Sequence, residues 1–235
     1  MENNIYKTLI IVPAYNEEGA IKKTVQTIKQ YNKECDVLVV NDGSKDSTLE
    51  KARETDSIVI DLPSNLGIGG AVQTGYQYAK KNNYDIAIQV DGDGQHDPKY
   101  IPEMIDILTK QNFDMVIGSR FIEKTSYKQT FFRMLGINIT SGIIKMMTGK
   151  KIHDTTSGFR AVNKKILSYF ANDYPYDYPE PDTNMRMVLK GMKIKEIPVE
   201  MKQRETGVSS ISPLKSISYM LKVTLSLFVT RIRKL

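Results

Sequence analysis

Two aspartates, Asp91 and Asp93, stand at the end of an apolar run with a single glycine between them. Side chains two positions apart on an extended backbone leave the same side of the chain, so the two carboxylates are expected to face one space. Crowded carboxylates repel each other unless a cation holds them together. Oxygen ligands on a short glycine-flanked turn suit Mg²⁺ or Mn²⁺ bridging to phosphate groups, and Gln95 offers a further neutral oxygen. The alternative is that these residues only form a turn after a strand.

Polar residues also follow two earlier apolar runs. The sequence P-A-Y-N-E-E occupies residues 13–18, and N-D-G-S occupies residues 41–44. The carboxyl ends of parallel strands share one edge of the sheet, where ligands bind, so these segments and residues 91–96 are expected to meet there. At that edge the ring of Tyr15 could stack on a nucleotide base, and Asp42 could accept a hydrogen bond from a base N–H. A simple turn is the alternative for Asp42 and the glycine after it.

The elements that must position these residues alternate along the first half of the chain. Continuous apolar runs indicate strands buried on both faces, and the segments between them show the spacing of amphipathic helices. The 235 residues contain no repeat, low-complexity stretch or linker, so we expect a single α/β domain with a mostly parallel sheet flanked by helices. The expected strands are residues 8–13, 36–40, 57–61, 85–90 and 114–118, and the expected helices are residues 21–31, a helix from about Ser47, and residues 70–81.

A glycine-rich segment, N-L-G-I-G-G, occupies residues 65–70 before one of these helices. It follows the third expected strand and lacks the G-x-G-x-x-G spacing of a dinucleotide-binding turn, so it is weak evidence for a nicotinamide cofactor. We expect a tight loop that lets the following helix approach the sheet.

Taken in order, six motifs resemble those of inverting family-two glycosyltransferases with the GT-A fold. They are V-P-A-Y-N-E-E, V-V-N-D-G-S-K-D-S-T, N-L-G-I-G-G-A, D-G-D-G-Q-H-D-P, G-S-R-F and T-S-G-F-R-A. The sequence is most similar to the branch of dolichol- and polyprenyl-phosphate sugar synthases, over roughly the chain up to residue 210. The resemblance implies a GT-A domain over residues 1–213, with a nucleotide-binding half to about residue 97 and an acceptor half from about residue 98.

The resemblance implies donor-side roles for residues of each motif. A divalent cation, Mg²⁺ or Mn²⁺, would bridge the donor diphosphate, and Arg120 of G-S-R-F resembles an arginine that binds phosphate near the reaction centre. Residues 204–209 resemble an R-x-x-G-x-S loop that can close over the donor phosphates. The implied nucleotide-sugar contacts are Pro13, Ala14, Tyr15, Glu17, Asp42, Asp91, Arg204 and Ser209, and the implied metal ligands are Asp91, Asp93 and Gln95.

The resemblance to the family is less complete on the acceptor side. Arg133 falls where the lipid-phosphate enzymes carry a second basic residue, but Ile137 stands where they have a serine. His153 and Asp154 precede T-T-S-G-F-R-A, which borders the acceptor cavity in the relatives.

A turn rich in acids, aromatics and prolines, residues 174–182, precedes an expected helix over residues 183–190. A hydroxyl acceptor needs a general base to remove its proton, whereas an ionised phosphate acceptor does not. Asp182 falls where the relatives place the acid that faces the acceptor, and Glu180 competes with it for this role. Capping of the helix is the structural alternative for Asp182.

The C-terminal segment combines an apolar stripe with positive charge. Residues 201–235 hold seven Lys or Arg against one acid, a charge of +6 that equals the net charge of the whole chain. The stripe indicates an amphipathic helix over residues 214–235, too polar to span a bilayer, which we expect at an anionic membrane surface. Packing on the protein's own core is the alternative, and a small membrane partner protein could complete the anchorage. The stripe comprises Leu214, Ile217, Leu221, Leu225, Phe228, Ile232 and Leu235.

Together these features predict an enzyme that moves a sugar, of hexose type, from a nucleotide-diphosphate donor to a lipid-linked acceptor, in cell-envelope polysaccharide or glycoconjugate synthesis. The acceptor is either a polyprenyl phosphate or a hydroxyl of a lipid-linked glycan. The single cysteine, Cys35, and a start unlike a signal peptide predict the cytoplasmic face of the membrane. No nucleic-acid-binding pattern is present. The alternatives are a catalytically silent nucleotide-sugar-binding or scaffold protein, and a nucleotidyltransferase, which would carry a Gly-rich basic loop after the first strand.

Overall fold

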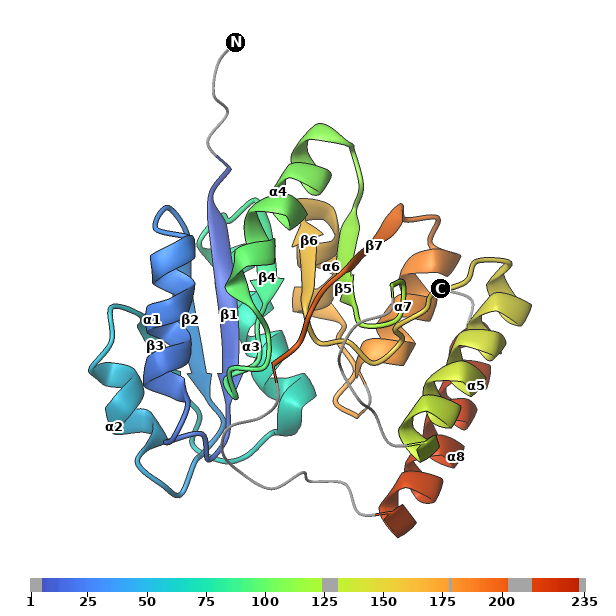
Figure 1. Cartoon of the computed structure of the whole chain (residues 1–235), viewed down its shortest axis with the longest axis horizontal. Helices are drawn as coiled ribbons and strands as arrows, with labels where there is room; N and C mark the ends of the chain where they lie inside the picture. Colours follow the sequence, from blue (N-terminus) through green and yellow to red (C-terminus); the bar gives the residue numbers. More distant parts are fainter. Residues whose placement is uncertain (1–5, 124–130, 178, 203–212, 233–235) are drawn as a thin grey trace.

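Among the residues that the structure describes, seven strands form one sheet at the centre of the protein (Figure 1). The computed structural model describes residues 6–123, 131–177, 179–202 and 213–232, without the side chains of residues 131–133 and 213–221. The strand order is β3-β2-β1-β4-β6-β5-β7, and of these strands only β6 runs antiparallel to its neighbours, β4 and β5. The strands are β1 Thr8–Ala14, β2 Asp36–Asn41, β3 Ile58–Asp61, β4 Ile86–Gln89, β5 Met115–Ser119, β6 Arg160–Asn163 and β7 Ile194–Pro198.

Helices cover both faces of this sheet (Figure 1). On one face pack α1 Ile21–Tyr31, α2 Thr48–Arg53 and α4 Ile101–Lys110. On the other face pack α3 Gly67–Lys81 and α6 Lys164–Asn172. The remaining helices are the short 3₁₀ helix η1 Pro98–Tyr100, α5 Phe131–Thr148, α7 Pro179–Leu189 and α8 Pro213–Ile232.

The central strands are apolar without alternation because both of their faces are buried. Along β1, Leu9 and Ile11 enter the core beneath α3 and α6, while Ile10 and Val12 enter the core beneath α1 and α4. The helices instead bury a single stripe, which in α1 comprises Ile21, Thr24, Val25 and Ile28. The result is the expected α/β domain, with a rigid set of strand ends from which loops can project.

The predicted strands agree with β1 to β5 to within one residue at each end, and the predicted helix over residues 21–31 coincides with α1. The prediction of a loop over residues 65–70 was wrong, because α3 already begins at Gly67. A Cβ at Gly69 would lie 2.2 Å from the carbonyl oxygen of Pro175, so here the helix approaches another chain segment. The helix does approach the sheet at Gly75, where a Cβ would lie 2.3 Å from Ile11.

A third, smaller apolar cluster joins α5, α7 and α8. It buries Ile144, Met185, Val223 and Leu227. In Figure 1, α5 and α8 lie side by side at the edge of the molecule beyond β7. Among the residues that the structure describes, no helix combines the length and apolar character needed to cross a membrane.

Candidate active site

The loops that follow β1, β2 and β4 meet at one edge of the sheet, as predicted. The backbone N–H of Asp42 donates to the carbonyl of Ala14 at 2.9 Å, and that of Gly92 donates to the carbonyl of Pro13 at 3.2 Å. The N–H of Asn16 donates to Ser44 Oγ at 3.0 Å. These bonds exist because β1 lies between β2 and β4, so the three strands end side by side.

Two of the predicted nucleotide contacts differ in their surroundings. Tyr15 is 42% exposed, so its side chain is accessible to a ligand. Asp42 is buried, and its Oδ1 accepts the backbone N–H of Leu66 at 2.7 Å, next to the start of α3. Burial raises the pKa of Asp42, although backbone N–H groups of Leu66 and Gly67 act in the opposite direction. The Asp42 carboxylate thereby links the loop after β2 to the glycine-rich segment.

Asp91 lies at the centre of the converging loops and is held from two sides. Its Oδ1 accepts a hydrogen bond from Gln89 Nε2 at 3.2 Å, and its Oδ2 lies 3.7 Å from His96 Nε2. The side chain is still 35% exposed. Behind it lies Gly158, where a Cβ would come within 3.1 Å of both carboxylate oxygens. Asp91 is therefore oriented by the protein while remaining open to a ligand.

Sequence reasoning missed His96 as a residue that shapes this site. Its Nδ1 accepts the backbone N–H of Asp91 at 3.0 Å, which places the ring proton on Nε2, facing the carboxylate. The ring is 5% exposed and stacks on Phe159 at 5.0 Å between centroids. The D-x-D-x-Q-H order could have predicted this role, because a histidine five positions after Asp91 can fold back over the turn and contact Asp91.

Asp93 and Gln95 complete the predicted ligand set on the same turn. Asp93 Oδ1 accepts the backbone N–H of Gln95 at 3.0 Å. The amide nitrogen of Gln95 donates to the carbonyl of Lys202 at 3.2 Å, which leaves the amide oxygen as the group suited to a cation. Among the described residues no three His, Cys, Asp or Glu side chains gather into a metal cluster. Two carboxylates and an amide suit an ion whose other ligands are water and substrate phosphates, as is usual for Mg²⁺.

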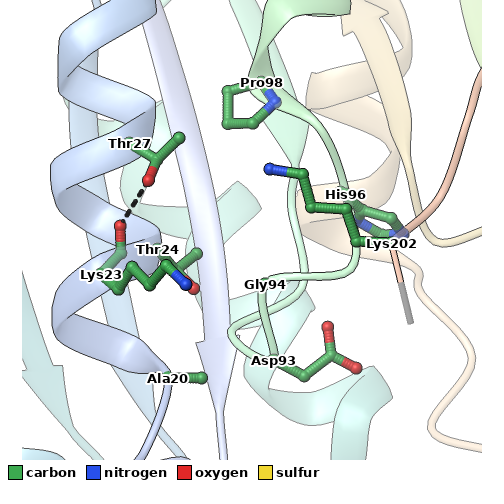
Figure 2. A pocket seen from close by; sticks show the side chains of 9 residues that line it. All are labelled: Ala20, Lys23, Thr24, Thr27, Asp93, Gly94, His96, Pro98 and Lys202. Atoms are coloured by element: carbon green, nitrogen blue, oxygen red, sulfur yellow. Dashed lines mark hydrogen bonds between the residues drawn. The ribbon is translucent and has the colours of Figure 1, made fainter. Parts of the chain in front are cut away.

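A small cavity lies beside this turn, between it and α1 (Figure 2). Asp93, Gly94 and His96 line it from the turn, Lys23 and Thr24 line it from α1, and Lys202 closes one side. Its volume of about 50 Å³ is far below that of a nucleotide-sugar site. This cavity is therefore too small to be the predicted nucleotide-sugar site.

Arg120 lies directly after β5 and is fixed by a bidentate ion pair. Its Nε and one terminal nitrogen each lie 2.7 Å from an oxygen of Asp154. Arg120 is 5% exposed and Asp154 is 0% exposed. The prediction that Asp154 lies at the acceptor is corrected here, because a fully buried carboxylate bound to a guanidinium cannot face a substrate. Asp154 instead orients Arg120.

The structure also corrects the prediction that Asp182 is the acceptor-side base. Both of its oxygens accept hydrogen bonds from Arg186, at 3.0 and 2.9 Å, and Oδ1 also accepts from Thr230 of α8 at 2.7 Å. The carboxylate is buried in the contact between α7 and α8, so it is not placed to take a proton from an acceptor. It is not a helix cap either, because α7 begins at Pro179.

Glu180 lies two residues before Asp182, and charged groups of the candidate site influence its pKa. Burial raises its pKa, the positive charge of Arg160 lowers it, Asp91 raises it further and Arg120 lowers it. Asp91, Arg120 and Arg160 are thus close enough for their charges to act on Glu180. Glu180 is only partly buried, whereas Asp182 is buried, and a role for Glu180 at the acceptor stays a prediction.

The other predicted acceptor-side residues are either structural or outside the described residues. His153 Nδ1 lies 2.9 Å from Glu196 of β7, whose carboxylate also accepts the backbone N–H groups of His153 and Asp154. This arrangement braces the turn before β6. The side chain of Arg133 and the loop with Arg204 and Ser209 lie outside the described residues.

Comparison with known proteins agrees with this architecture. The model of the family described as glycosyl transferase family 2 matches residues 9–170. The chain belongs to this family. It is 29% identical over 227 residues to polyprenol monophosphomannose synthase of Mycolicibacterium smegmatis, covering 92% of this chain and 85% of that protein. It is 30% identical over 219 residues to undecaprenyl-phosphate mannosyltransferase of Micrococcus luteus, covering 88% of each.

A solved structure shares the fold over nearly the whole length of this protein. Glucosyl-3-phosphoglycerate synthase from Mycobacterium tuberculosis, in complex with Mn²⁺, uridine diphosphate and phosphoglyceric acid, has a TM-score of 0.70. It is 16% identical and covers 97% of this chain and 79% of that one. At this identity the likeness establishes the fold, which is the GT-A type expected from the sequence.

Proposed function

We propose that this family-two chain transfers a sugar, with inversion, from a nucleotide-diphosphate donor to a polyprenyl phosphate at the cytoplasmic face of the membrane. The observation that carries this proposal is that the loops with Tyr15, Asp42 and Asp91, which follow β1, β2 and β4, meet at one edge of the sheet. The named relatives that act on polyprenol or undecaprenyl phosphate support the acceptor class.

In the proposed reaction an oxygen of the lipid phosphate attacks the anomeric carbon as the bond to the nucleotide diphosphate breaks. The acceptor monoester becomes a phosphodiester, and the nucleotide diphosphate leaves with the negative charge. A divalent cation held by Asp91, Asp93 and Gln95 would supply charge neutralisation at the diphosphate. The chain's own contribution is to hold Asp91 between Gln89 and His96 and to fix the Arg120 guanidinium through Asp154.

The test is transfer from a panel of labelled nucleotide sugars to polyprenyl phosphate in vesicles with Mn²⁺ or Mg²⁺, with the product identified by its mass. Asp93→Asn is expected to abolish transfer while the melting temperature stays close to that of the wild type. Asp106→Asn is the matched control, because Asp106 makes only a surface ion pair with Lys110 on α4. Transfer by Asp93→Asn at the wild-type rate, or full activity after chelation, would contradict the proposal. Nucleotide-sugar binding without turnover would favour the silent binding protein.

A second candidate acceptor is a hydroxyl of a lipid-linked glycan, for which Glu180, partly exposed and influenced by the charges of Asp91 and Arg120, is the candidate base. A hydroxyl must lose its proton during attack, and removing a general base typically costs about 10²–10⁴-fold in rate. Glu180→Gln separates the two acceptors, because only the hydroxyl reaction requires the carboxylate. Retention of most activity with polyprenyl phosphate would support the phosphate acceptor, and loss by that factor with a glycan acceptor would support the hydroxyl.

Membrane association, the last part of the proposal, is supported by α8 together with α5. The side of each helix opposite the buried cluster exposes large apolar residues, which on α5 include Leu135 and Ile139 and on α8 include Leu225, Phe228 and Ile232. The two helices contain five basic residues and no acid, namely Arg133, Lys145, Lys215, Lys222 and Arg231. An exposed apolar face on helices that carry basic residues and no acid suits the interface of an anionic bilayer.

A further inference from the structure

Arg160, in the T-S-G-F-R-A motif, is a fully buried cation beneath the candidate site. It is 0% exposed and lies in β6, directly opposite Gln89 of β4. Within the part of the chain that the structure describes, no carboxylate lies within ion-pair distance of its guanidinium. A charge taken out of water without such a partner is costly to the fold, so an apolar residue of similar length would pack here at a lower cost.

The guanidinium makes two short hydrogen bonds to two different parts of the site. One terminal nitrogen donates to the carbonyl of Ser157 at 2.7 Å, and the other donates to Thr183 Oγ1 of α7 at 2.7 Å. The residue after Ser157 is Gly158, which packs against the carboxylate of Asp91. Arg160 thus connects the wall behind Asp91 to the helix on the acceptor side.

Thr183 in turn forms hydrogen bonds with the first turn of α7. Its hydroxyl oxygen lies 2.6 Å from the carbonyl of Pro179 and 3.1 Å from that of Glu180. Because Thr183 accepts from Arg160 and donates to this turn, the position of the Glu180 backbone depends on where the guanidinium lies.

Gln89, which is paired with Arg160 across β4 and β6, forms a hydrogen bond with Asp91. Its amide nitrogen donates to Asp91 Oδ1 at 3.2 Å, while its amide oxygen has no hydrogen-bond partner. Among the described residues, the Nε of Arg160 also has none. The structure therefore leaves one donor and one acceptor unused on directly paired residues of β4 and β6.

The charge of Arg160 acts on the same groups. It opposes the rise in pKa that burial causes in Glu180, and it does the same for the hydroxyls of Tyr76 and Tyr174. Asp91 and Arg120 are the other charges that influence Glu180. Besides its two hydrogen bonds, Arg160 thus acts on Glu180 through its charge.

We propose that Arg160 is a positioning residue that fixes the first turn of α7 relative to the Gly158 wall behind Asp91, so that the acceptor, phosphate or hydroxyl, meets the donor at the correct separation. This inference rests on the proposed transfer reaction, but it concerns a residue that need not touch either substrate. Misplacement of reacting groups by about 1 Å can cost about 10²-fold in rate, so the effect should appear in kcat.

The experiment compares Arg160→Met, Arg160→Lys and Thr183→Val with the wild type. We expect Arg160→Met to lower kcat about 100-fold and Thr183→Val to lower it about tenfold, with the donor KM within about twofold of the wild type. Arg160→Lys should recover part of the loss, because an ammonium keeps the charge but cannot hold both acceptors in the fork geometry of a guanidinium. Thr183→Val keeps the inference testable should Arg160→Met fail to fold.

An unchanged kcat in Thr183→Val, or a rise in donor KM that matches the fall in kcat, would overturn the inference in favour of general structural support. Failure of the proposed function is distinguished by the wild type, which would then show no transfer. In that case hydrogen exchange decides, since Thr183→Val must speed exchange in the first turn of α7 and at residues 157–159. Unchanged exchange there would equally overturn the positioning role.

Discussion

The ion pair between Asp182 and Arg186 offers the sharpest test of how the acceptor side is built. Asp182 and Arg186 are 6% and 11% exposed in their side chains, and Thr230 adds a hydrogen bond of 2.7 Å from α8. Arg186 also pairs with Asp173 at 2.9 Å. If Asp182 is structural, as this geometry indicates, then Asp182→Asn should reduce stability and leave catalysis by the folded protein intact.

The size of the effect follows from burial. Because both groups are largely removed from water, solvent screening is weak, and loss of one partner of such a pair costs about 3 kcal/mol. Thr230→Val removes only the hydrogen bond to the carboxylate and should cost about 1.5–3 kcal/mol. For a chain of this size about 1 kcal/mol shifts the melting temperature by about 2–4 °C, so Asp182→Asn should melt about 6–12 °C lower.

The assay is thermal unfolding of Asp182→Asn, Thr230→Val and the double variant, with kcat measured well below each melting temperature. We expect the double variant to lose less stability than the sum of the single variants, because both changes remove the same contact. Each variant should keep kcat within about threefold of the wild type, whereas loss of a general base would lower it about 10²–10⁴-fold. A large fall in kcat of Asp182→Asn with an unchanged melting temperature would refute the structural role.

Three further predictions follow from the geometry. Gly158→Ala would place a Cβ 3.1 Å from both oxygens of Asp91, and the shift needed to relieve it should lower kcat/KM about tenfold, whereas Gly142→Ala, with nothing within 4 Å, should have no such effect. Burial raises the pKa of the Cys35 thiol to about 11, so at pH 8 almost no thiolate forms and iodoacetamide should label the native protein far more slowly than the unfolded protein; equal labelling rates would be the contrary result. Phe228→Gln, on the exposed face of α8, removes apolar area without changing the charge and should weaken cosedimentation with anionic vesicles, and binding that persists unchanged would point to a protein partner instead.

The donor half of the site was predictable because its determinants are local. Buried parallel strands can be recognised in the sequence as continuous apolar runs. The carboxyl ends of these strands determine which loops meet. Tyr15, Asp42 and Asp91 therefore came together as the sequence indicated. His96 was not predicted, because its role depends on the closure of one tight turn and on stacking against Phe159 of a distant segment.

The acceptor half could not be predicted in the same way, because it depends on tertiary contacts. The strand β6 is only four residues long and enters the sheet antiparallel between β4 and β5, so no periodic pattern marks it. Arg160 in this strand would read as an exposed residue from its type alone, yet it is fully buried. The helix α7 begins four residues earlier than predicted, with two prolines in its first turn, and this shift places Asp182 inside the helix and against α8 rather than at a helix cap.

That shift explains how one helix serves two contacts. Residues two apart on a helix differ by about 200° in direction, so Glu180 and Asp182 must face opposite sides of α7. One side meets the charges of Arg160 and Asp91, and the other meets Thr230 of α8. The same turn therefore holds Glu180 and the residue to which α8, the helix with the exposed apolar face, is attached. Thr230 of α8 donates a buried hydrogen bond to Asp182, whose carboxylate is held in turn by Arg186 of α7, so this contact fixes α8 against the first turn of α7.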